Sequence, residues 1–197
     1  MDVEILEETE NTIRFILSGV SSAFANALRR IMIAEVPTMA IEDVIIVENT
    51  SIMYDEILSH RLGLVPLTTD LDSYVLPKDC SCGSDLGCGR CRASFTLEVE
   101  AKDSKIPLLT GDLKPMDTAV APVSDRIPLV SLAPGQKVKL EAYARLGRGA
   151  EHAKWQPVSV CAYKYLPRLS ANVEKCDGCG GCVKFCPKGI LSLENGR

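Results

Sequence analysis

Apolar and polar residues alternate along the first 18 positions of the chain. Val3 and Ile5 alternate with charged residues, and after a polar stretch Ile13, Phe15 and Leu17 alternate again. A period of two on both sides of a short polar segment is typical of two antiparallel strands joined by a turn. We therefore expect residues 2–17 to form a β-hairpin.

The period then becomes helical. Four apolar residues recur at i, i+3, i+4 and i+7, namely Phe24, Ala27, Leu28 and Ile31. This spacing places them on one face of an α-helix. Ser21 or Ser22 can cap the start of the helix, and Pro37 prevents it from continuing.

Further along, the β-branched run Val44–Val47 predicts a well-buried strand. A short helix is expected from Asp55 to Leu62, with Asp55 as N-cap and Gly63 as the C-terminal stop. Clear alternation predicts two more strands, over residues 95–101 and 138–144.

The rest of the chain has weaker periodicity. Residues 103–136 are rich in proline and are expected to be long connections, and residues 147–149 should break the preceding strand. Residues 157–163 predict another strand, and residues 190–193 resemble a strand without a partner. Helices inserted among antiparallel strands indicate an α+β fold.

Composition narrows the functional classes. The 197 residues are 46% hydrophobic and 24% charged, with a net charge of −4, so the totals lack the basic excess of non-specific nucleic-acid binders. No apolar run is long enough to span a bilayer, and the first residues do not resemble a signal peptide. Eight of the nine cysteines have metal-type spacing, and together with the missing export signal this predicts a cytoplasmic protein with no membrane association.

The most specific motif is a run of four cysteines that ends in Cys-Pro. Its spacing is C-x2-C-x2-C-x3-C-P, with ligands Cys176, Cys179, Cys182 and Cys186. Ferredoxins of bacterial type hold iron–sulfur clusters with this run, so we predict a 4Fe-4S or 3Fe-4S cluster. A zinc knuckle or a disulfide-bonded loop is the alternative.

The same motif raises a question about the fourth cysteine. In two-cluster ferredoxins the last cysteine of such a run binds the other cluster, but this sequence contains no second run. Two explanations are open: the cluster has an unusual fourth ligand or an open iron corner, or the sequence stops before the second half of the domain. We expect the sequence to be a fragment.

A second cysteine group reads C-x-C-x5-C-x2-C and comprises Cys80, Cys82, Cys88 and Cys91. Four neighbouring thiolates suit a closed, structural zinc site, and disulfides or iron are the alternatives. Because protein ligands would fill all four positions, catalytic zinc is not expected. The remaining cysteine, Cys161, fits a buried apolar position.

Catalytic motifs are not apparent. Neither His60 nor His152 accompanies a recognisable nucleophile, and P-loop and dinucleotide fingerprints are absent from the sequence. We expect structural or interface roles for both histidines and no catalytic residue in this chain.

Three segments carry a family resemblance: residues 22–42, 55–67 and 149–158. They resemble, in the same order, the alpha-like subunit family of DNA-dependent RNA polymerases in its archaeal form. The resemblance covers roughly residues 1–170, and some members of that family carry a ferredoxin-like insertion.

The resemblance implies a discontinuous dimerisation domain (residues 1–48 and 156–170), an inserted mainly-β domain (49–155) and a partial ferredoxin-like domain (171–197). It implies a non-catalytic assembly platform within a nucleotidyltransferase complex. Expected partners are the small alpha-like subunit L, the large catalytic subunits and the small subunits N and P, with DNA contacted only through the complex. The implied interface residues are Phe24, Asn26, Leu28, Arg29, Arg30, Ile31, His152, Lys154 and Trp155.

The resemblance also implies that relatives hold zinc at the position of residues 80–91. The family's closing strand and helix lack a counterpart here, so we expect weakened stability or dimerisation. A further hypothesis is that the cluster responds to redox state. Two other functions remain open from the motifs alone: an iron–sulfur electron carrier or redox-enzyme subunit, and a zinc-dependent nucleic-acid-binding module.

Overall fold

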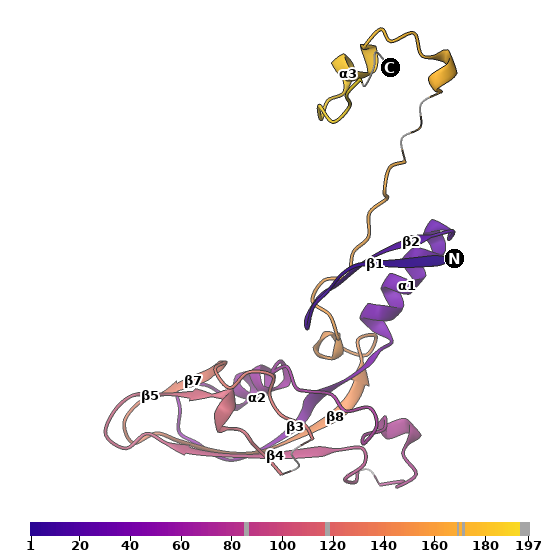
Figure 1. The fold of residues 1–197 in the computed structure, drawn as a ribbon. Coiled ribbons are helices and arrows are strands. Elements are labelled where there is room, and N and C mark those ends of the chain that lie inside the picture. Colours follow the sequence, from indigo (N-terminus) through magenta and orange to yellow (C-terminus); the bar gives the residue numbers. More distant parts are fainter. Residues whose placement is uncertain (85–86, 117–118, 169, 171, 194–197) are drawn as a thin grey trace. The chain divides into compact units, whose positions relative to one another are not determined.

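The chain folds into two compact units, residues 1–162 and residues 163–197 (Figure 1). The structure is a computed structural model and describes residues 1–84, 87–116, 119–168, 170 and 172–193. Each unit is considered by itself. The mixture of helices and mainly antiparallel strands confirms the α+β class expected from the sequence.

The expected N-terminal hairpin and helix are both present. Strand β1 (Asp2–Glu8) pairs antiparallel with β2 (Ile13–Ser18), and helix α1 (Ser22–Ala34) follows. Ser21 is the N-cap, and its hydroxyl accepts a hydrogen bond from the Phe24 amide at 3.3 Å. No residue of α1 is buried, which leaves its apolar stripe accessible.

A four-stranded antiparallel sheet is the centre of the first unit. Its order is β3 (Pro37–Asn49), β8 (Lys137–Arg148), β4 (Ala93–Glu100) and β6 (Lys114–Pro115). β8 ends within the segment 147–149, as expected, but later than its first glycine, since Gly147 and Arg148 still pair with Thr38 and Pro37.

Strand β3 differs from its predicted burial. Ile45 and Val47 are 52% and 59% exposed, whereas Val44 and Ile46 pack partly against the core. The strand lies at an edge of the sheet and one of its faces meets solvent, so the continuous apolar run alternates in burial.

The proline-rich region is more ordered than predicted. Strands β5 (Ile106–Leu109) and β7 (Pro128–Leu132) form a separate two-stranded sheet, and a short 3-10 helix (Thr110–Asp112) follows β5. The two runs are too short and too interrupted by proline to show a period, and only their pairing with each other identifies them as strands.

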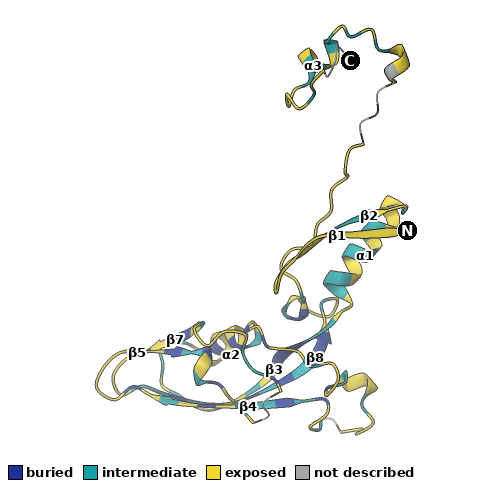
Figure 2. Ribbon diagram, viewed as in Figure 1, coloured by how far each residue is buried: buried dark blue, intermediate teal, exposed yellow. Residues whose placement is uncertain are grey.

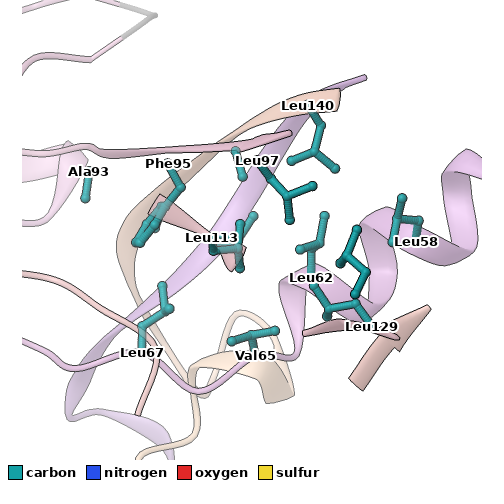
Figure 3. Packing of buried hydrophobic residues seen from close by; sticks show 14 of the residues in the cluster. Leu58, Leu62, Val65, Leu67, Ala93, Phe95, Leu97, Leu113, Leu129 and Leu140 are labelled. Carbon is teal, nitrogen blue, oxygen red and sulfur yellow. The ribbon is translucent and has the colours of Figure 1, made fainter. Parts of the chain in front are cut away.

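Helix α2 (Asp55–Gly63) closes the core over the sheet. Its Leu58 and Leu62 are fully buried and belong to the same hydrophobic cluster as Leu129 of β7 and Leu97 of β4 (Figure 3). Asp55 is the first helical residue and not the N-cap, which is Tyr54. Its carboxylate instead accepts a hydrogen bond from Asn49 at 2.7 Å.

Burial is concentrated in this core, between residues 39 and 155, whereas the hairpin and α1 have only half-buried or exposed residues (Figure 2). The expected strands at 157–163 and 190–193 are not formed, because neither segment finds a pairing partner among the described residues. The remaining elements are the 3-10 helices Pro77–Asp79, Ala153–Trp155 and Val173–Lys175 and the short helix α3 (Gly181–Phe185). Among the described residues, no helix is both long and apolar enough to cross a membrane.

Candidate metal centres and subunit interface

The first cysteine group is gathered at one point. Cys80, Cys82, Cys88 and Cys91 lie in the loop between the 3-10 helix Pro77–Asp79 and β4, and their sulfur atoms all lie within 4.8 Å of one another. Neighbouring sulfurs are separated by 3.7 Å (Cys80 to Cys88) and 4.0 Å (Cys82 to Cys91). Four sulfurs at such separations can surround a single ion.

A tight turn fixes two of these ligands. The Cys91 amide donates to the Cys88 carbonyl at 3.0 Å, and the Cys88 amide donates to the Cys91 sulfur at 3.2 Å. The donor set is all thiol and leaves no place for water, so it fits a closed tetrahedral site for a soft or borderline metal such as zinc.

The four thiols differ in acidity. The backbone amide of Arg90 and the neighbouring Cys80 thiol lower the pKa of Cys88 to about 7, whereas burial raises the pKa of Cys91 to about 12. Thiolates are the metal-binding form. Cys88 therefore offers a thiolate near neutral pH, while Cys91 requires the charge of the metal to lose its proton.

The second cysteine group lies in the C-terminal unit. Cys182 is in α3, Cys186 is its C-cap, and Cys176 and Cys179 precede the helix. Among the described residues, only the first group has its sulfur atoms close enough together to surround a single ion.

Two local features suit the C-terminal loop to a cluster. Gly178 and Gly180 have φ values of 72° and 70°, which let the backbone turn tightly between the cysteines. Backbone amides of Ile190 and Lys188 lower the pKa of Cys186 and so favour its thiolate. The chemistry of this donor set fits an iron–sulfur cluster.

The predicted interface residues on α1 are accessible to differing degrees. Phe24 and Ile31 are 46% and 50% exposed, Arg30 is exposed, and Leu28 is half-buried. Asn26 is held within the helix, where its side-chain oxygen accepts two hydrogen bonds from Arg29 at 3.1 and 3.2 Å. Cys161, expected to be buried, is half-buried, with its sulfur 3.8 Å from that of Met32.

The interface residues of segment 149–158 occupy different environments. His152 is exposed, and its imidazole accepts a hydrogen bond from the Lys154 amide. Trp155 is only 2% exposed, so its ring belongs to the interior of this unit and offers little surface to a partner. Arg145 and Lys154 flank the ring at 4.4 and 4.5 Å from its centroid.

Glu42 joins these two cations. Its carboxylate forms ion pairs with Arg145, at 3.1 Å, and with Lys154. Partial burial would raise the pKa of Glu42, but these two pairs outweigh it and hold the pKa below its ordinary value. We call Glu42, Arg145, Lys154 and Trp155 the Trp155 cluster.

A second contact joins the cysteine loop to the sheet. Arg92 directly follows Cys91, and its guanidinium lies 4.5 Å from the ring centroid of Tyr143 in β8. It also forms an ion pair with Asp43 in β3. The sequence alone suggested no role for Arg92, Asp43, Glu42 or Arg145, because their ion pairs join residues 49 to 112 positions apart and no local pattern marks them.

Comparisons with known proteins match two segments of the chain, and the second contains the C-terminal cysteine group. Residues 41–160 match the RNA polymerase Rpb3/RpoA insert domain, and residues 170–192 match the 4Fe-4S binding domain. The chain is 48% identical over 198 residues to DNA-directed RNA polymerase subunit Rpo3 of Methanosphaera stadtmanae, an alignment covering 99% of this chain and 72% of that protein. Rpo3 of Archaeoglobus fulgidus is 45% identical, with 100% and 72% covered, and Rpo3 of Methanothermobacter thermautotrophicus is 44% identical, with 100% and 74% covered.

Proposed function

We propose that this chain, which belongs to the Rpo3 family of DNA-directed RNA polymerase subunits, is a non-catalytic assembly subunit of such a polymerase. The observation that carries the proposal is the unburied apolar stripe of α1 in a chain with this family membership. A helix face that its own chain leaves uncovered is suited to a partner subunit.

The α1 stripe and the hairpin are proposed to bind the small alpha-like subunit L. Val3, Ile5 and Ile13 of the hairpin are each more than half exposed, as are Met1 and Leu6. These side chains add to Phe24 and Ile31 of α1, so apolar surface recurs on all three N-terminal elements. Burying it against a partner would release the free energy that the isolated chain cannot gain.

Four polar residues, Arg29, Arg30, His152 and Lys154, are proposed to contact the large catalytic subunits and the small subunits N and P. Arg30 and His152 are exposed, and Arg29 and Lys154 are half-buried. The proposed domain arrangement has residues 1–48 and 156–170 in the dimerisation domain, 49–155 in the inserted domain and 171–197 in the ferredoxin-like domain. The match of residues 41–160 to an insert domain supports this division approximately.

Both cysteine groups are proposed to be structural metal sites. Zinc at Cys80, Cys82, Cys88 and Cys91 would order a polar loop, and metal affinity would then contribute to folding. An iron–sulfur cluster at Cys176, Cys179, Cys182 and Cys186 would order the C-terminal unit, supported by its match to a 4Fe-4S domain. A structural cluster in an assembly subunit is also a candidate redox sensor, because losing the cluster would unfold its unit.

Native mass spectrometry after anaerobic co-production with subunit L tests the proposal. The expected species is a one-to-one heterodimer. Replacing Ile31 by Lys places a charge on the stripe and should weaken the heterodimer at least about tenfold, or about 1.4 kcal/mol. Ile45→Lys is the matched control, because Ile45 is equally exposed but lies on an edge strand, where lysine is tolerated.

The outcomes separate clearly. Loss of the heterodimer in Ile31→Lys but not in Ile45→Lys supports α1 as the partner surface. Equal binding by both variants and the parent chain would assign the partner to another surface. A parent chain that never binds subunit L would contradict the assembly role.

A further inference from the structure

We propose that Arg92 is a positioning residue. When a metal binds at the cysteine loop, Arg92 passes the resulting ordering on to segment 147–155, which contacts the C-terminal end of α1. The inference rests on the zinc site proposed above, and it concerns how that site acts on the rest of its unit.

The first step joins the metal ligands to Arg92. A metal bound by both Cys88 and Cys91 would fix the turn between them. The Arg92 amide donates to the Cys88 carbonyl of this turn at 2.9 Å, and Gly87 packs against the Arg92 side chain. Fixing the turn therefore fixes the backbone from which the Arg92 guanidinium projects.

In the second step, the Arg92 side chain contacts two neighbouring strands of the sheet. The guanidinium stacks on Tyr143 of the central strand β8 and pairs with Asp43 of the edge strand β3. The Arg92 side chain is 20% exposed and the Asp43 side chain 61%, so water reaches the carboxylate, and the contact with Tyr143 is the less screened of the two. A planar guanidinium can lie flat on an aromatic ring and at the same time pair with a carboxylate through its N–H edge.

The third step lies at an irregularity in β3. The register between β3 and β8 shifts between Ile41 and Asp43, so Glu42 is an extra residue without a cross-strand partner. At this bulge, adjacent residues have different partners: Asp43 holds Arg92, and Glu42 holds Arg145 and Lys154 of the Trp155 cluster. Moving the bulge would disturb both sets of ion pairs.

The last step reaches α1. Beyond the Trp155 cluster, the Ala150 amide donates to the carbonyl of Ala34, the last residue of α1, at 2.9 Å. Gly149 lies against the Ile33 carbonyl, where no side chain would fit, and Arg148 pairs with Glu35 at 3.5 Å. Segment 147–155 therefore fixes the end of the helix that is proposed to bind the partner.

Continuity of contacts does not by itself establish coupling, so the experiment measures coupling directly. Amide hydrogen exchange of the full chain would be followed with and without one equivalent of Zn²⁺ under reducing, anaerobic conditions. In the parent chain we expect zinc to slow exchange at least about threefold in peptides covering residues 75–92, 37–43 and 147–155.

Arg92→Met should separate the local effect from the distant one. The variant keeps all four thiols and should still bind one zinc and protect residues 75–92, but it should lose the zinc-dependent protection of 37–43 and 147–155. Arg90→Met is the matched control, because Arg90 lies in the same loop, carries the same charge and is exposed. Asp43→Asn removes the pair from the other strand and should reproduce Arg92→Met, which covers the case in which that variant fails to fold.

The results distinguish two failures. If the parent chain binds zinc and only residues 75–92 respond, or if Arg92→Met keeps the distant response, the role of Arg92 is overturned while the zinc site stands. If the parent chain binds no zinc at all, the zinc assignment falls and the coupling falls with it.

Discussion

The indole ring of Trp155 lies directly against Gly147, at a place where any Cβ atom would overlap the ring. The Trp155 Nε1 donates to the Arg145 carbonyl at 3.3 Å, and its own carbonyl accepts from the Thr38 hydroxyl at 2.7 Å. The ring therefore occupies a slot on β8 that exists only because residue 147 has no side chain.

Gly147→Ala should consequently destabilise the chain by about 1 to 3 kcal/mol, the usual cost of inserting atoms into a packed interior. The measurement is urea unfolding followed by tryptophan fluorescence, which reports this ring because the chain has a single tryptophan. Gly63→Ala is the matched control. Its added carbon would meet the nearest atom at 3.5 Å, an ordinary contact, and should change stability by less than about 0.5 kcal/mol. Equal effects of the two substitutions would contradict the slot.

Glu42 should make stability depend on pH. Its pKa is lowered in the folded chain, where burial opposes but ion pairs with Lys154 and Arg145 outweigh it. A carboxyl whose folded pKa lies below its unfolded value stabilises the fold above the unfolded pKa, about 4.3, and loses that contribution as pH falls through the folded value.

The parent chain should therefore be more stable than Glu42→Gln at pH 7, and the difference should shrink as pH falls below about 4. Unfolding free energies of both proteins at several pH values, in the presence of a chelator, provide the measurement. Glu98→Gln provides a comparison with an exposed pair: hydrogen bonds from Lys139 and Lys137 also lower the pKa of Glu98, so the same trend with pH is expected, with a smaller amplitude because solvent screens the pair. A difference for Glu42→Gln that stays constant with pH would mean that the glutamate acts by packing alone.

Local patterns predicted some elements of this fold well. The hairpin, α1 and its Ser21 cap follow from periodicity and capping within a few residues. The resemblance to archaeal polymerase subunits, drawn from three segments, is confirmed by relatives 44% to 48% identical over nearly the whole chain. Both cysteine groups stand out from their spacing alone; the structure gathers the four sulfurs of the first within 4.8 Å, and the second lies in a segment that matches a 4Fe-4S binding domain.

Features that depend on distant residues were missed. The pairing of β5 with β7 and the exposure of Ile45 arise from strand order, which a period cannot encode. Trp155 was expected to be at an interface but is buried, since only the folded chain brings Gly147, Arg145 and Lys154 around it. The Arg92 contacts likewise join a loop to two strands that are distant in sequence.

Removing one ligand of the first cysteine group should abolish its metal binding. Cys91 is buried and lies within 4.0 Å of the Cys82 and Cys88 sulfurs, so Cys91→Ser leaves three thiols and a poorer ligand. We expect bound zinc to fall from one per chain to well below half of that. The rise in melting temperature that zinc causes in the parent chain, several degrees for each 1 kcal/mol of stabilisation, should disappear. Cys161→Ser is the control, because Cys161 belongs to neither group. Zinc binding that survives unchanged in Cys91→Ser would mean that Cys91 is not a zinc ligand.

In the C-terminal unit, Asp177 should support the cluster without binding it. Its carboxylate accepts a hydrogen bond from the Cys179 amide at 3.1 Å, and hydrogen bonding to Cys179 lowers the pKa of Asp177, so the carboxylate form persists at neutral pH. This contact orders the turn between two proposed ligands, Cys176 and Cys179. Outer residues that orient metal ligands commonly contribute tenfold or more in affinity.

Asp177→Ala should therefore lose its reconstituted cluster about tenfold faster than the parent chain when exposed to air. Iron and sulfide content and the visible absorption of the cluster, followed over time, provide the measurement. Asp177→Asn separates the hydrogen bond from the charge, because an asparagine oxygen can still accept from the Cys179 amide. Slow loss in Asp177→Asn together with fast loss in Asp177→Ala would assign the effect to the hydrogen bond, whereas fast loss in both would assign it to the negative charge. Parent-like decay in both variants would mean that the cluster is held by the cysteines without help from this turn.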